Sequence, residues 1–175
     1  MTTLVKPRKG TATRARARRT RKNREAEGDQ KQIVRDRDRR CRFPVCGCWQ
    51  IGAPNAWPEV SHDRHKGMGG NPTGDRSTAA EMILLCHHRH QGGIVSRDRK
   101  TLRVRALTDA GNAGPVAFEV KRSALVVGPL LQVMAAPDTP ASTWVEVARE
   151  RAPHELARLL PWQVAVLAVL AEMTL

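Results

Sequence analysis

The hydrophobic and polar positions in the first third of the chain predict a long polar segment followed by a short strand. Residues 1–28 show no apolar periodicity, and this segment is expected to be disordered without a partner, with helix possible only late in the stretch. A short helix is possible from Asp29 to Arg40, where charged residues dominate. A short strand is expected near Glu59 and Val60, where it would end at His62.

Farther along, the pattern predicts a buried strand and then a hairpin. The apolar run from Met82 to Leu85 predicts a short buried strand that passes into a helix, and Gly92–Gly93 would end that helix. Apolar residues alternate with others over Leu102–Leu107 and again over Val116–Val120. These two strands are expected to form a hairpin-like pair joined across Asp109–Gly114.

The last third of the chain predicts a linker and then helices. Residues 123–141 mix apolar residues with glycine and proline, and Leu125–Val127 could add a third strand. A capping-box pattern and two prolines suited to first helical turns predict helices after the linker, at Thr143 with Glu146, at Pro153 and at Pro161.

The final segment, Trp162–Leu175, is apolar on nearly every face. We expect an ordinary buried helix here, and the competing interpretation is a helix that docks on a partner protein. The apolar run within this segment is shorter than the roughly 20 residues that a bilayer crossing needs. The sequence therefore predicts no membrane-spanning helix.

Most of the excess charge lies in the first 24 residues. The 175 residues carry a formal net charge of +13 and are enough for one ordinary domain plus tails. Residues 1–24 hold ten Lys and Arg and no acidic residue. Such an arm either binds nucleic-acid phosphates without reading sequence or is a solvated tail, and charge alone does not decide between the two. The candidate phosphate contacts in the arm are Arg14, Arg16, Arg18 and Arg19.

The four cysteines fit a metal site better than a disulfide scaffold. The N-terminal charges are not followed by an apolar run, so export is not expected and the thiols should be reduced. Cys41 with Cys46 or Cys48 would supply two thiolates from a compact knuckle, and Cys86 a third. The fourth ligand of a closed zinc site would be His88, with Cys48 as the alternative. The competing interpretation is a set of buried thiols without metal.

Histidines are concentrated in one stretch. Five of the six histidines lie between His62 and His90, on both sides of a glycine-rich loop that runs from His65 to Ser77. Imidazole is a preferred ligand of zinc and related metals and is also the side chain best suited to proton transfer near neutral pH. This crowding indicates metal binding, proton transfer or both.

The order of these motifs resembles the HNH endonucleases, particularly the small phage and prophage type. The resemblance rests on Cys41–Pro44, on the run SHDRHKGMGGNP from Ser61 to Pro72, and on LCHHRH from Leu85 to His90, and it covers residues 29–93. It implies a ββα-metal fold, in which two antiparallel strands and a helix hold one divalent cation. We therefore expect an α+β protein with this core, a zinc knuckle, an appended β-hairpin and C-terminal helices.

The resemblance also implies residue roles. By position, His62 corresponds to the general base at the end of the first strand, and His90 to a ligand of the catalytic ion, Mg²⁺ or Mn²⁺. The family often has a metal ligand just before the base, where Ser61 stands here, so that ligand could instead come from His65 or Asp63. In the loop, the cations Arg64 and Lys66 are either phosphate contacts or solvated side chains.

Two other positions depart from the family pattern. Glu81 stands where the family has its central Asn, and Asn71 in the loop could replace that Asn, although its spacing differs. Arg89 stands where the family has the second thiolate of a downstream CxxC. These departures concern individual roles within the expected fold.

The resemblance implies a metal-dependent endonuclease that hydrolyses DNA in the cytoplasm of a bacterial host, encoded by that host or by a phage. We expect a disordered basic arm at 1–28, a nuclease core with its hairpin at 29–122, and a linker with C-terminal helices at 123–175. The alternatives are a zinc-stabilised DNA-binding protein without catalysis, or an accessory subunit of a phage DNA-processing machine. DNA is the expected partner in the first two cases, and a protein contacted by the C-terminal helix in the third.

Overall fold

A computed structural model of the chain describes residues 10–44, 46, 58–62, 78–125, 140 and 142–172; among residues 10–19 the side chains of 15, 17 and 18 are placed. The elements, in chain order, are α1 (Gly10–Asp38), β1 (Pro58–His62), η2 (Ala79–Glu81), β2 (Met82–Cys86), η3 (His88–Gly92), β3 (Leu102–Ala106), η4 (Gly111–Ala113), β4 (Val116–Lys121), α2 (Arg122–Leu125), β5 (Trp144–Ala152), β6 (Glu155–Leu156) and α4 (Pro161–Glu172).

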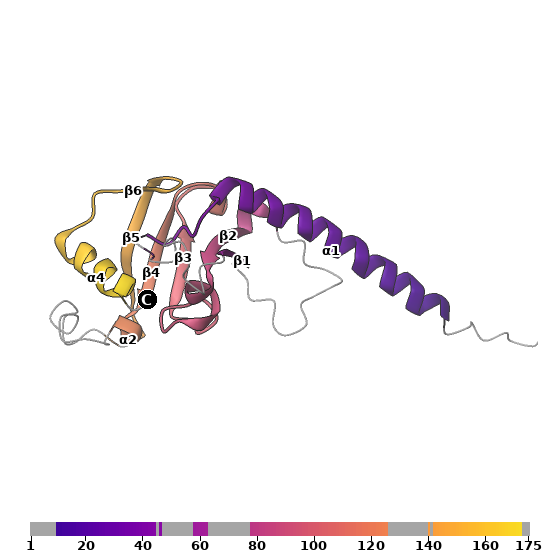
Figure 1. The fold of residues 1–175 in the computed structure, drawn as a ribbon, viewed down its shortest axis with the longest axis horizontal. Helices are drawn as coiled ribbons and strands as arrows, with labels where there is room; N and C mark the ends of the chain where they lie inside the picture. Colours follow the sequence, from indigo (N-terminus) through magenta and orange to yellow (C-terminus); the bar gives the residue numbers. More distant parts are fainter. Residues whose placement is uncertain are drawn as a thin grey trace, which may run out of the picture.

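These elements build a mixed α+β protein with two antiparallel sheets. β1 pairs with β2, with His62 opposite Met82 and Pro58 opposite Cys86. The second sheet has the strand order β3-β4-β5-β6. Most of α1 extends away from the sheets, and α4 lies at the opposite end of the body (Figure 1). The predictions of a strand around Val60, of a buried strand passing into a short helical segment after Cys86, and of the β3–β4 hairpin are confirmed.

The β1–β2 hairpin lies between two apolar clusters, and this explains the uninterrupted apolar run in its sequence. All five residues of β2 are buried. Met82 and Leu84 pack with Val34 of α1 in a small cluster, whereas Ile83 and Leu85 belong to the main core. Because successive side chains of a strand point to opposite faces, a strand buried on both faces has apolar residues at consecutive positions instead of an alternating pattern.

The basic segment is helical from Gly10, where the sequence predicted disorder over residues 1–28 with helix only late in that stretch, and a short helix over Asp29–Arg40. α1 spans 29 residues, Gly10–Asp38. Its sequence is rich in Ala, Arg, Lys, Gln and Glu, and these residues have high helix propensity even where no apolar face is present. Ion pairs one turn apart join Arg21 to Glu25 and Lys31 to Glu27. The prediction of disorder is therefore wrong for residues 10–28, and the helix expected late in that stretch is confirmed; residues 1–9 lie outside the described residues.

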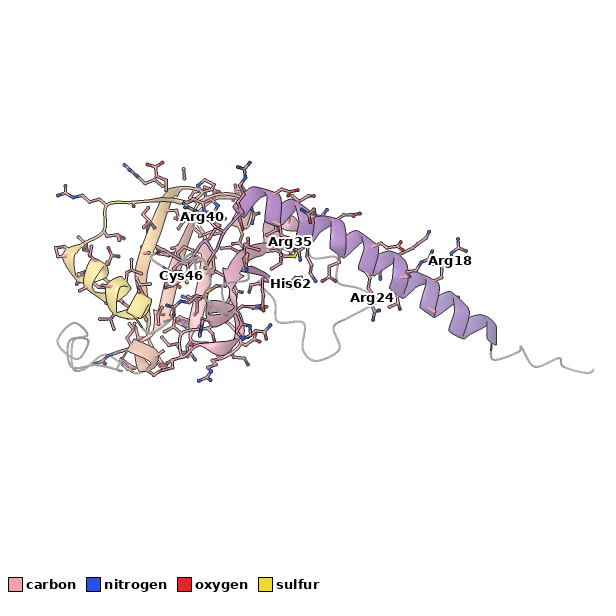
Figure 2. All side chains as sticks on the ribbon, viewed as in Figure 1. Arg18, Arg24, Arg35, Arg40, Cys46 and His62 are labelled. Atoms are coloured by element: carbon pink, nitrogen blue, oxygen red, sulfur yellow. The ribbon has the colours of Figure 1, made fainter. Side chains whose placement is uncertain are left out.

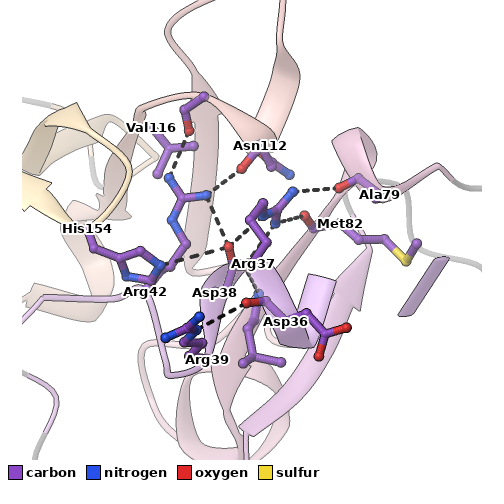
Figure 3. Close-up of polar contacts among 12 residues, drawn as sticks. Asp36, Arg37, Asp38, Arg39, Arg42, Ala79, Met82, Asn112, Val116 and His154 are labelled. Atoms are coloured by element: carbon purple, nitrogen blue, oxygen red, sulfur yellow. Dashed lines mark hydrogen bonds and ion pairs between the residues drawn. The ribbon is translucent and has the colours of Figure 1, made fainter. Parts of the chain in front are cut away.

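A buried polar network fixes the C-terminal end of α1 to the body. The Asp38 carboxylate accepts hydrogen bonds from the Arg37 side chain at 2.6 and 2.9 Å and from the Leu84 backbone at 2.9 Å. Figure 3 shows this carboxylate where Arg37, Arg42 and His154 meet. Arg42 is fully buried and also pairs with Glu150 of β5. The network therefore ties the helix to both sheets.

The helices predicted over residues 143–160 are wrong. Residues 144–152 form β5 and residues 155–156 form β6, and β5 pairs with β4. The register between β4 and β5 shifts next to Phe118, where Val147 is the extra residue of a β-bulge, and this interrupts the alternation along β5. Glu146, expected in a capping box, instead pairs across the sheet with Arg105.

One predicted C-terminal helix is confirmed. α4 begins at Pro161, in the first-turn position that suits proline, and it packs into the main core through Val166, Leu167 and Leu170. Val164 on its other face remains exposed. In the described part of the chain, no helix combines the length and apolarity that a membrane crossing requires. Of the possible strand at 125–127, Leu125 ends α2 and the other two residues lie outside the described ranges.

Candidate metal and catalytic site

The segment after α1 and the end of β2 bring three buried cysteines together. Cys41 and Cys46 come from the first, and Cys86 is the last residue of β2. Their sulfur atoms all lie within 4.8 Å of one another, and Sγ of Cys46 is 3.3 Å from Sγ of Cys86, well beyond the about 2.05 Å of a disulfide bond. Around zinc, with Zn–S bonds of about 2.3 Å, tetrahedral sulfurs stand about 3.8 Å apart. The cluster therefore fits one thiolate-bound metal ion.

Backbone pairing and an aromatic contact place the knuckle against β2. The Arg42 N–H donates to the Leu84 carbonyl at 3.0 Å, which aligns the segment carrying Cys41 alongside the strand that ends in Cys86. The Phe43 ring meets the Phe118 ring edge-on, with centroids 5.4 Å apart, and both rings are buried in the main core. The cysteine cluster is thus fixed by the fold around it.

The predicted fourth ligand is not in this cluster. His88 is not among the described residues whose ligand atoms lie within 4.8 Å of one another with the three sulfurs. The alternative, Cys48, lies outside the described residues. The structure therefore brings together three of the four residues first expected to hold zinc.

Glu59 of β1 holds two histidines that follow β2. Its Oε1 lies 3.0 Å from Nδ1 of His87, and its Oε2 lies 2.7 Å from Nδ1 of His90. Gln91 donates to Oε2 as well, at 3.0 Å. The antiparallel register explains the meeting, because it puts the start of β1 beside the end of β2, from which η3 continues. A carboxylate in this position favours the tautomer with the proton on Nδ1 of His90, so that Nε2 carries the lone pair.

The two histidines also set the charge state of Glu59. Partial burial raises the pKa of its carboxyl, but the hydrogen bonds from His87 and His90 and the attraction of their charges outweigh this, and the pKa lies below its ordinary value. Glu59 is therefore ionised near neutral pH. No role was predicted for Glu59 from the sequence; the available signal was its position two residues before Ser61, on the same face of β1.

Ser61 and His62 lie on opposite faces of β1. Ser61 is buried and pairs with Ile83, whose side chain belongs to the main core. His62 lies on the face that Val60 shares with α1, and its Nε2 is 3.5 Å from Oε1 of Glu27 in that helix. Figure 2 shows His62 beside the part of α1 nearest the body. The side chain predicted to be the general base therefore lies against α1.

A turn after η3 joins the two ends of the candidate site. The backbone of Arg97 donates to the Arg89 carbonyl at 3.0 Å, and the Arg97 guanidinium donates to the His62 carbonyl, also at 3.0 Å. The next residue, Asp98, donates from its backbone to the His90 carbonyl at 3.0 Å. The segment that carries His90 is therefore tied to the strand end that carries His62.

Glu81 and Arg89, the departures from the family pattern, have structural roles. Glu81 ends η2 at the surface, where its carboxylate accepts from the Thr78 backbone at 2.9 Å. Arg89 is buried, lies over the Phe43 ring at 4.6 Å, and donates to the Leu170 carbonyl at 2.6 Å. The loop residues predicted to take part lie outside the described ranges: Asp63, Arg64, His65, Lys66 and Asn71.

The basic arm presents its described cations to solvent. Arg18, Arg21, Lys22 and Arg24 are exposed, and Figure 2 shows Arg18 and Arg24 along the projecting part of α1. Arg14, Arg16 and Arg19 belong to the same helix, but their side chains are outside the described set. The backbone thus puts the predicted phosphate contacts on one rigid element.

Comparison of this chain with protein-family models, with curated proteins and with solved structures found no match.

Proposed function

We propose that the chain is a metal-dependent endonuclease of the HNH type that hydrolyses phosphodiester bonds in DNA. The observation that carries the proposal is the carboxylate of Glu59 between Nδ1 of His87 and Nδ1 of His90, on the hairpin that also presents His62. A hairpin followed by a short helical segment with an oriented histidine supports a ββα-metal site, although Glu59 and His62 lie on opposite faces of β1. The ββα-metal core is part of this proposal.

Each residue has a defined task in the proposed reaction. His90 would bind a divalent cation, Mg²⁺ or Mn²⁺, through Nε2, with His65 as a candidate further ligand; Ser61, predicted as a ligand from the sequence, is buried against the main core. Bound there, the cation would polarise the phosphate and stabilise the departing 3′-oxygen. His62 accepts the proton of the attacking water as its oxygen bonds to phosphorus and the P–O3′ bond breaks. Neutral imidazole is the form that can do this.

The cysteines and the arm would support this chemistry without taking part in it. Zinc bound by Cys41, Cys46 and Cys86, with a fourth ligand from Cys48 or His88, would hold the knuckle against β2. The cations of α1 supply affinity for the DNA backbone without sequence readout, and that affinity falls as salt rises. DNA is the partner on which the proposal depends.

The test is nicking of supercoiled plasmid by the purified full chain with Mg²⁺ or Mn²⁺. Wild type should nick and His62→Ala should lose at least about 100-fold in rate, because general-base catalysis contributes roughly 10²–10⁴-fold. His90→Ala should lose activity to a similar degree. Gln32→Ala, a change at an exposed residue of α1, is the matched control and should nick like wild type, whereas a contaminating nuclease would leave the same nicking in His62→Ala and His90→Ala. Unchanged nicking by His62→Ala, with zinc content and circular dichroism equal to wild type, would show that the base is assigned wrongly.

A second candidate function is a zinc-stabilised DNA-binding protein without catalysis. The observation that favours it is the state of two positions: Ser61 is 1% exposed and faces the main core, and Glu81 caps η2 at the surface. Neither side chain is placed as the family's metal ligand or central Asn would be. This candidate predicts salt-sensitive retention of DNA with no cleavage under any divalent cation.

A further inference from the structure

One face of the second sheet carries charged side chains, whereas its other face is apolar. Along β3, Arg103 and Arg105 are exposed. The residues that alternate with them, Leu102 and Val104, belong to the main core. The register with β4 and β5 brings further charged side chains to the face of the two arginines. We call this surface the arginine face, and its charged and aromatic members are Arg103, Arg105, Glu119, Lys121, Trp144, Glu146 and Arg149.

Two carboxylates hold the three guanidinium groups of the arginine face in place. Glu119 accepts hydrogen bonds from Nε of Arg103 at 2.5 Å and from Nε of Arg105 at 2.9 Å. Glu146 accepts from Nη2 of Arg105 at 2.9 Å. It also accepts from Nε and Nη2 of Arg149, at 2.8 and 2.9 Å. The arginine side chains are therefore ordered before any ligand arrives, which lowers the entropic cost of binding one.

The guanidinium groups are more accessible to solvent than the carboxylates that hold them. The side chains of Arg103, Arg105 and Arg149 are 49%, 45% and 51% exposed, and those of Glu119 and Glu146 are 9% and 26% exposed. Within the described ranges, Nη1 of each of the three arginines makes no hydrogen bond. Each guanidinium therefore keeps N–H donors for a ligand that approaches from solvent.

Trp144 and Lys121 extend the arginine face, and its charge is positive. Cζ of Arg103 lies 4.7 Å and Nζ of Lys121 lies 5.6 Å from the centroid of the Trp144 ring. Partial burial raises the pKa of the Glu119 carboxyl, but hydrogen bonds from Arg105 and Arg103 outweigh this, so the pKa lies below its ordinary value and Glu119 is ionised. With both carboxylates ionised, the four cations of the face still leave a formal charge of +2.

We propose that the arginine face binds the phosphate backbone of DNA as a second contact surface besides α1; this inference takes its partner, DNA, from the proposed function. The outward N–H groups donate to phosphate oxygens, and the planar guanidinium suits phosphate geometry better than an ammonium group does. Such contacts position DNA without reading its sequence. An acidic protein is the competing partner. The exposed cations of α1, Arg18, Arg21 and Arg24, favour DNA, because both surfaces then bind one ligand.

The salt dependence of DNA binding tests the arginine face directly. The full chain is titrated into a labelled DNA duplex at several salt concentrations, without Mg²⁺ or Mn²⁺, and binding is followed by fluorescence anisotropy. Arg105→Gln and Arg149→Gln should each reduce the slope of log K against log salt by about 1, because each removes one phosphate contact. The matched control is Arg158→Gln, a change at an exposed arginine outside β3, β4 and β5, which should keep the wild-type slope. Glu146→Gln should tighten binding several-fold at fixed salt, since it removes a negative charge from the face.

A second measurement needs no substitution in the face, so it decides the matter if a variant does not fold. Backbone ¹H–¹⁵N spectra of wild type are recorded while the same duplex is added. The amide signals of Arg105 and Arg149 should shift. Those of Val166 and Leu167, in the part of α4 that packs into the main core, should not. Circular dichroism of each variant shows whether its slope can be compared with that of wild type.

The outcomes distinguish failure of the inference from failure of the proposed function. If wild type binds DNA but folded Arg105→Gln and Arg149→Gln keep the slope of Arg158→Gln, the inference is overturned. It is also overturned if poly-glutamate shifts the Arg105 and Arg149 signals and DNA does not, because the partner is then an acidic protein. If no divalent cation supports nicking but both arginine variants lose slope, the endonuclease proposal fails and the inference stands.

Discussion

Replacement of Arg42 by methionine should destabilise the protein severely. Arg42 is fully buried, and its guanidinium contacts the carboxylates of Asp38 and Glu150 and donates to the backbone carbonyls of Asn112 and Gly114. Methionine has a similar length and no charge, so Arg42→Met removes the cation and leaves the shape of the site largely filled. What remains is a buried Glu150 carboxylate without its main counter-charge.

The two carboxylates are affected unequally. Asp38 keeps the Arg37 side chain and the Leu84 N–H. Among the described residues, Glu150 keeps two backbone donors, the N–H of Val116 at 3.1 Å and the N–H of His154 at 3.2 Å. Removal of one partner from a buried ion pair costs about 3–5 kcal/mol, because the other charge stays buried and unpaired. For a chain of this size that corresponds to a fall of about 10 °C in the melting temperature.

Urea denaturation followed by tryptophan fluorescence, with zinc present, measures this free energy of unfolding. The control is Arg103→Ala, which also removes an arginine paired with a glutamate, Glu119, but whose side chain is 49% exposed. Its cost should be about 0–1 kcal/mol. Arg42→Met with Glu150→Met removes both charges and should be more stable than Arg42→Met alone. Equal costs for Arg42→Met and Arg103→Ala would refute the reasoning from burial.

Two further predictions concern the cysteine cluster and His154. Cys86→Ser, or a chelator, should release one zinc equivalent and lower the melting temperature by at least about 10 °C, because a structural zinc contributes folding free energy directly. Metal analysis and calorimetry measure these two changes. Ser123→Ala, away from the cluster, should change neither the zinc content nor the melting temperature. The pKa of His154 is lowered, first by burial and then by the charge of Arg42. Because the unfolded chain binds this proton near pH 6.5 and the folded chain only at lower pH, stability should fall as pH drops below about 7 and level off below the folded pKa. His154→Asn, which suits the φ of 65° at this position, should remove that part of the pH dependence of urea unfolding.

The parts of the fold that the sequence predicted are those in which periodicity and burial agree. Leu102, Val104 and Ala106 alternate along β3, and the outcome is a regular strand paired with β4. In β5, periodicity and burial do not agree, and there are two physical reasons. The bulge at Val147 makes two consecutive residues, Val147 and Ala148, buried, and Glu150 points inward to meet Arg42. Neither feature can be recognised before its partner strand is known.

In the candidate site, too, some residues could be predicted from the sequence and others could not. Cys41, Cys46 and Cys86 could be predicted together because thiolates at these spacings have few other uses, and the structure brings their sulfurs together. Glu59 could not, because a single acidic residue in a strand is ordinary. Its importance comes from its tertiary contacts with His87 and His90.

The pairing of Arg42 with Glu150 also bears on when the fold is completed during synthesis. The two residues are 108 positions apart, and they join the knuckle that follows α1 to β5. At about 5–20 residues per second, a ribosome needs roughly 5–20 s to add that stretch. During this time Arg42 is a cation without its buried partner, so the knuckle cannot settle against the second sheet. Under the proposed function, a nascent chain that already carries the basic arm and both candidate histidines is therefore expected to bind DNA before it can cut it.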